Sequence, residues 1–223
     1  MNAVVSRAAS EADQSERAWW LRALAVLQSP SAVFVALRDD STDAAEARQE
    51  PVTAIVILAG IAAVLAAPRT GTLMDDVIMD GLSAAVIIFL AGALYGLSVY
   101  WLAGGTLFFS SEHLGSLGSY RRSRHLLAYA AVPLVLSLPV IWPVRLALYG
   151  SDVFKSGGSD SGVGAHVFSA LEIGFVAWAV VLLVVGVRAV NGWTWWRALA
   201  AATLAVGLTA GLLAVLGVIL HGA

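Results

Sequence analysis

The chain has 223 residues, of which 59% are hydrophobic and 13% charged, with a mean hydropathy of +0.82. This balance excludes an ordinary soluble domain, which is about half apolar and a quarter charged. The net charge of −2 gives no basis for nucleic-acid binding, and the lack of cysteine excludes disulfides and cysteine nucleophiles. Because the uncharged residues gather in runs of bilayer length, we predict an all-α, polytopic transmembrane helix bundle.

The N-terminal residues are expected to lie in front of the bundle. Residues 1–16 are small, polar and acidic, without the apolar core of a secretory signal, so we expect a disordered cytoplasmic tail. Residues 17–50 are expected to form short interfacial helices and a polar linker. Trp19 and Trp20 beside arginines favour a helix at the headgroup level, and Pro30 suits the first position of a second helix. A helix docked on the bundle is the alternative.

The transmembrane domain is expected over residues 51–223, with its first spans at about 51–67 and 82–103. The two glycines at 104–105 are expected to break the second helix, because glycine is a poor helix former. Gly92 and Gly96 form a GxxxG pair. Packing inside the bundle is the default expectation for this pair, and homodimerisation is the minority one.

The third span is expected over about residues 126–149 and is interrupted by proline. Pro133, Pro139 and Pro143 predict kinks in this helix, because proline removes a backbone hydrogen bond. A basic linker stands directly before the span and contains three arginines that are either topology signals or contacts for anionic lipid headgroups: Arg121, Arg122 and Arg124.

Two charges are predicted inside membrane segments. Arg145 lies near the outer end of the third span, and Glu172 lies about one turn inside the fourth, which is expected over about residues 167–187. Charges inside a bilayer are costly and are usually paired or functional. A hairpin between these spans would bring both to similar depth, so we predict an ion pair. The alternative is that each side chain reaches the headgroups separately.

The fifth span is expected over about residues 198–220 and carries a second GxxxG pair, Gly207 and Gly211, as a further packing candidate. The short loop before this span is predicted to anchor the chain at the membrane interface through three aromatic residues: Trp193, Trp195 and Trp196.

The arginine distribution predicts the orientation in the membrane. Ten arginines lie in the N-terminal segment, in the loop between the second and third spans, and in the loop between the fourth and fifth spans: Arg7, Arg17, Arg22, Arg38, Arg48, Arg121, Arg122, Arg124, Arg188 and Arg197. The opposite side carries only Arg69, Arg145 and Lys155. Because basic loops stay in the cytoplasm, we predict a multi-pass cell-membrane protein with a cytoplasmic N-terminus and an external C-terminus.

Three features together resemble the Yip (Ypt-interacting protein) superfamily of five-span membrane proteins, in its bacterial branch. They are the pre-membrane segment with Pro30 and Phe34, the five-span layout, and the entrance to the third span with Tyr129 and Pro133. The resemblance covers about residues 20–220. It implies an integral membrane protein without known catalysis, whose eukaryotic relatives act in vesicle trafficking with small GTPases. The short tail and incomplete Tyr/Gly pattern depart from those relatives.

The sequence predicts no catalytic residue, no cofactor and no metal site, since no carboxylate pair, histidine cluster or nucleophile–base arrangement stands out. The first hypothesis is therefore a non-enzymatic protein that organises or scaffolds partner membrane proteins, or associates with itself, in contact with anionic lipids of the bilayer. The alternative is a small transporter or lipid-handling permeation subunit that uses the proline-broken third span, because broken helices form substrate sites in transporters.

Overall fold

The computed structural model describes residues 24–75, 79–160 and 162–221. All regular elements in these ranges are helices and none is a strand, which confirms the all-α prediction. The predicted headgroup helix around Trp19 and Trp20 lies outside the described residues.

Seven α-helices and two 3₁₀ helices follow one another in the described part of the chain: α2 (Pro30–Ala36), α3 (Thr42–Leu65), η1 (Pro68–Thr72), α4 (Gly81–His113), α5 (Tyr120–Ala130), α6 (Val132–Tyr149), η2 (Gly150–Phe154), α7 (Val163–Asn191) and α8 (Trp195–His221). Among the described residues, five segments are long and apolar enough to cross a membrane, as predicted: Thr42–Leu65, Gly81–His113, Tyr120–Phe154, Val163–Asn191 and Trp195–Val215.

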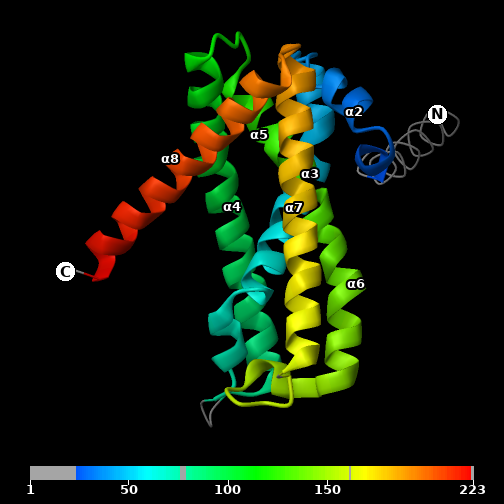
Figure 1. Cartoon of the computed structure of the whole chain (residues 1–223), viewed down its shortest axis with the longest axis vertical. Coiled ribbons are helices and arrows are strands. Elements are labelled where there is room, and N and C mark those ends of the chain that lie inside the picture. Colours follow the sequence, from blue (N-terminus) through cyan, green and yellow to red (C-terminus); the bar gives the residue numbers. More distant parts are fainter. Residues whose placement is uncertain (1–23, 76–78, 161, 222–223) are drawn as a thin grey trace, which may run out of the picture.

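The long helices form an elongated bundle with two distinct ends (Figure 1). α3, α4, α6 and α7 run along the long axis, whereas α8 slants away so that its C-terminal end lies far from the other helices (Figure 1). We call the end with the α4–α5 and α7–α8 connections the arginine-rich end. The end with η1, η2 and the start of α7 is called the loop end.

The first two spans are longer than predicted. α3 begins at Thr42, inside the predicted polar linker, because residues 44–49 are mostly good helix formers and Pro51 is accommodated inside the helix. α4 continues through Gly104 to His113, so the predicted break is wrong. A Cβ at Gly104 would lie 2.3 Å from Cγ of Arg124, so glycine lets α5 approach closely. This packing offsets the low helix propensity of glycine, about 1 kcal/mol.

The predicted basic linker is the first turn of a helix, and the third span is two helices. Ser119 caps α5, where its hydroxyl accepts the backbone N–H of Arg122 at 3.0 Å. The chain leaves α5 at Ala131, and Pro133 is the second residue of α6, where its missing N–H costs nothing. α6 remains one helix across the two other prolines, Pro139 and Pro143.

Glycines bring α3 and α4 into close contact. A Cβ on Gly60 would lie 2.1 Å from the carbonyl oxygen of Gly92 and 2.6 Å from Cα of Gly96, so the two backbones touch. Gly92 and Gly96 therefore pack inside the chain. The second pair does not: a Cβ on Gly207 or Gly211 would meet nothing within 4 Å, so the packing predicted for these two is absent from the described residues.

The main core lies toward the arginine-rich end, where α2 docks against the bundle. Phe34 of α2 is fully buried, and its ring lies 3.0 Å from the position that a Cβ on Gly186 of α7 would take. A smaller apolar cluster at the loop end contains Ile141, Trp142 and Phe168. The two clusters hold opposite ends of α7.

Candidate functional site

At the arginine-rich end, α5 is tied to the segment before α3. Nε of Arg121 lies 3.1 Å from Oδ1 of Asp40, and its Nη2 donates to the Asp40 carbonyl at 2.6 Å. The Ser119 hydroxyl donates to the other carboxylate oxygen of Asp40. Arg122 donates to the carbonyl of Arg38 at 2.9 Å. Two of the three arginines predicted to contact lipid therefore bind protein acceptors.

Other arginines at this end bind the carbonyls that helix ends leave free. Arg38 donates from Nε to the carbonyl of Val190 at 3.1 Å and from Nη2 to Ala189 at 2.6 Å, so it covers the C-terminal end of α7. Arg197 of α8 donates to the carbonyl of Leu114 after α4. These arginines hold the helix ends together in addition to any topological role.

The Asp40 contacts predict a pH dependence of stability. Burial raises the pKa of Asp40, but hydrogen bonds from Ser119 and Arg121 and the nearby guanidinium charges outweigh burial, so the pKa falls below its ordinary 3.8. The ion pair therefore stabilises the fold above about pH 4 and loses its effect as the pH falls through the lowered pKa. We expect the thermal midpoint of wild type to exceed that of Asp40→Asn at pH 6, and the gap to narrow below pH 3.8.

Thermal unfolding in detergent, followed by circular dichroism between pH 6 and pH 3, measures this gap. Asp43→Asn is the matched control, because Asp43 is an exposed residue on the first turn of α3. The control is expected to follow wild type throughout. A gap for Asp40→Asn that stays constant across this pH range contradicts the prediction.

At the loop end, Arg145 of α6 binds two acidic side chains. Its Nη1 lies 3.1 Å from Oε1 of Glu172 on α7, so the structure brings the two predicted charges together. Its Nε and Nη2 donate to Oδ2 of Asp160, at 2.8 and 2.5 Å. The guanidinium carbon also lies 5.0 Å from the Trp142 ring centroid and 5.8 Å from that of Phe168. We call Arg145, Asp160 and Glu172 the charged triad.

The charged triad is largely shielded from solvent, since the side chain of Asp160 is 6% exposed and those of Arg145 and Glu172 are 16% and 17% exposed. Two carboxylates face one guanidinium, and Oδ1 of Asp160 is buried without a hydrogen-bond partner in the described residues. The triad fastens the α6–α7 loop to α6 through Asp160, and α6 to α7 through Glu172. The sequence gives no signal for the role of Asp160, because this residue lies in a Gly/Ser segment where no periodicity fixes its position.

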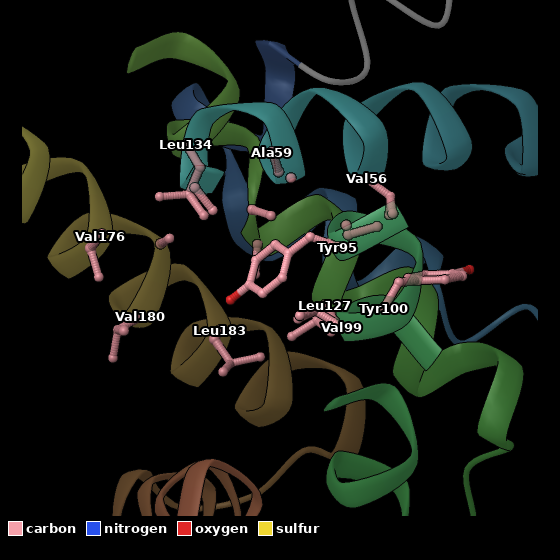
Figure 2. Close-up of a pocket in the computed structure, with 17 residues that line it drawn as sticks. Val56, Ala59, Tyr95, Val99, Tyr100, Leu127, Leu134, Val176, Val180 and Leu183 are labelled. Carbon is pink, nitrogen blue, oxygen red and sulfur yellow. The ribbon is translucent and has the colours of Figure 1, made fainter. Parts of the chain in front are cut away.

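An apolar cavity of about 260 Å³ lies between α3, α4, α5, α6 and α7. It lies beside the α5–α6 break, since Ala131 and Leu134 line it. The Tyr95 ring crosses the cavity and its hydroxyl points toward α7 (Figure 2). Nearly all other lining groups are apolar, among them Val176, Ala179, Val180 and Leu183 from α7. Such a cavity suits a hydrocarbon occupant.

The three tryptophans at the α7–α8 connection and the start of α8 differ in exposure. Trp195 and Trp196 are 53% and 81% exposed, as an interface anchor requires. Trp193 is 9% exposed and belongs to the core, so its predicted role as an anchor is wrong. The guanidinium carbon of Arg197 lies 4.5 Å from the Trp193 ring centroid.

Two of the residues that carried the family resemblance, Phe34 and Tyr129, belong to the main core. Pro30 begins α2, and Phe34, Tyr129 and Pro133 are buried. A sequence model of the Yip1 domain matches residues 24–218. The chain belongs to the Yip1 domain family. No curated protein and no solved structure matches this Yip1-domain chain. The match confirms the family and supports a multi-span membrane protein, which the five apolar helices also support.

Proposed function

We propose that this Yip1-domain chain is a non-enzymatic membrane protein that organises partner membrane proteins, or further copies of itself, within the bilayer. Its membership of the Yip1 family and its five apolar helices support an integral membrane protein. The concentration of arginines at one end supports a cytoplasmic N-terminus and an external C-terminus in the cell membrane.

The observation that carries the proposal is the divergence of α8 from the bundle (Figure 1). The N-terminal half of α8 packs against α4 and α7, with Ala198, Ala201 and Ala202 buried. Among the described residues, the hydrogen bond to the bundle nearest the C-terminal end of α8 joins the hydroxyls of Thr209 and Thr106 on α4, 2.7 Å apart. All side chains from residue 210 to residue 215 are exposed.

The exposed half of α8 has the composition of a helix–helix interface. Gly207 and Gly211 lie one turn apart with no atom of the described chain near the space above them. Inside a bilayer there is no hydrophobic force between helices, so small residues that permit close van der Waals contact promote association. A second helix, from a partner protein or another copy, is the occupant that this surface fits.

Purification of the tagged protein in native detergent tests the proposal through the proteins that co-purify. We expect a stoichiometric membrane protein or a second copy with wild type, and its loss with Gly207→Leu/Gly211→Leu. Gly174→Leu is the matched control, because Gly174 of α7 is also exposed and has nothing within 4 Å. A wild-type protein that is always monomeric and alone contradicts the proposal, as does loss of the partner with Gly174→Leu alone.

A further inference from the structure

Arg124 of α5 is held in a cage of three aromatic rings at the arginine-rich end. Its guanidinium carbon lies 3.8 Å from the ring centroid of Trp101, 4.7 Å from Tyr120 and 5.2 Å from Tyr100. Its aliphatic stem packs against α4 at Gly104, which leaves room for it. The position of this guanidinium is therefore set by contacts on several sides.

The guanidinium of Arg124 has no acceptor among the described residues. It forms no ion pair or hydrogen bond there, and its Nε is buried without a partner. Arg121 differs because it binds Asp40. Arg122 also has a buried Nε without a partner, but its Nη2 donates to the Arg38 carbonyl. A guanidinium carries five N–H donors, and aromatic rings cover its faces but accept few of them. An anionic group in the plane of the guanidinium would complete the site.

The aromatic cage adjoins the apolar cavity beside the α5–α6 break. Tyr100 belongs to the cage and also lines the cavity. Leu127 and Ala128 line the cavity from α5, three and four residues after Arg124, and therefore lie on the same helix face about one turn further on. The cavity then follows α7 from Leu183 to Val176, about 10 Å along the helix axis.

We propose that Arg124 and this cavity together bind one anionic phospholipid, with its phosphate on the guanidinium and an acyl chain in the cavity. The cavity is lined by apolar groups and lies among membrane spans, so the bilayer itself supplies an occupant of matching chemistry. Trp101, 53% exposed, and Tyr120 are side chains typical of the headgroup level, where the phosphate of a lipid lies.

The headgroup, not the chain, decides which lipid binds. An acyl chain that moves from the bilayer into the cavity exchanges one hydrocarbon environment for another, so it gains little hydrophobic energy. The attraction between one arginine and an anionic headgroup corresponds to about a five-fold preference over a zwitterionic lipid. The site contains no residue of the exposed half of α8, so this proposal does not depend on the proposed function.

Native mass spectrometry of the full chain in detergent tests the site. The protein is titrated with phosphatidylglycerol or with phosphatidylcholine of the same acyl chains, and bound lipid is counted. We expect wild type to prefer phosphatidylglycerol by about five-fold, and Arg124→Gln to bind both lipids equally. Arg188→Gln is the matched control, because Arg188 stacks on the single ring of Trp195, 4.5 Å away, and is exposed. It is expected to keep the preference.

A second variant tests the cavity independently of Arg124. Ala179→Leu places a larger side chain at a cavity-lining position and is expected to reduce the binding of both lipids several-fold. The proposal is overturned by an Arg124→Gln protein that keeps the wild-type preference, or by an Ala179→Leu protein that binds lipid as wild type does. Displacement of phosphatidylglycerol by millimolar inorganic phosphate also overturns it, because Arg124 would then be a site for a soluble anion.

Discussion

Replacing Arg145 with methionine is expected to lower the free energy of unfolding by about 3–5 kcal/mol. The reason is that Asp160 and Glu172 lie within 3.1 Å of its guanidinium and are largely buried, so the substitution leaves two carboxylates without a cation. Removing one partner of a buried ion pair is far more destabilising than replacing every partner by an uncharged side chain, because the remaining charge keeps its desolvation cost. Reversible unfolding in mixed detergent micelles, followed by tryptophan fluorescence, measures the loss.

A triple variant separates the charge effect from lost packing. In Arg145→Met/Asp160→Asn/Glu172→Gln no member of the charged triad keeps its charge, so most of the stability is expected to return. Methionine retains contact with the rings of Trp142 and Phe168, which keeps the local packing similar. If the triple variant is as unstable as Arg145→Met alone, the uncompensated charges are not the cause. If the free energy of unfolding of Arg145→Met lies within about 0.5 kcal/mol of the wild-type value, the triad contributes little to stability.

Hydropathy was sufficient to predict the five spans, because length and apolarity alone mark a membrane helix. Helix ends were less predictable: α3 begins at Thr42 among charged residues, and α4 passes through Gly104 because α5 packs there. Local composition does not contain that packing partner. The continuation of α4 past Gly104 therefore depends on a contact with α5 that the local sequence does not show.

The candidate sites divide in the same way. Arg145 and Glu172 were paired from the sequence because a hairpin sets their depths, whereas the loop that brings Asp160 to them has no regular pattern. The three arginines before the third span look alike in sequence. Only the structure separates Arg121 and Arg122, which bind protein carboxylate or carbonyl groups, from Arg124, which lies among aromatic rings.

The divergence of α8 has no sequence signal either. Its buried half and its exposed half are both rich in alanine and leucine. These residues pack equally well against other helices and against lipid, so they do not tell which half contacts the bundle. The GxxxG pairs illustrate the limit. Gly92 and Gly96 face Gly60 inside the chain, whereas Gly207 and Gly211 face open space, although the two motifs have the same spacing.

Gly60→Ala is expected to lower the free energy of unfolding by about 1–3 kcal/mol, because the added methyl group meets backbone and not a movable side chain. Its carbon would lie 2.1 Å from the Gly92 carbonyl oxygen and 2.6 Å from Cα of Gly96, so α3 and α4 must separate. Gly174→Ala is expected to raise the free energy of unfolding instead. Nothing lies within 4 Å of a Cβ at that position, and alanine is the better helix former by up to about 1 kcal/mol. The same micelle unfolding measurement compares both variants with wild type. The backbone contact between α3 and α4 is contradicted if the two substitutions change the free energy of unfolding equally, or if Gly60→Ala stabilises the protein.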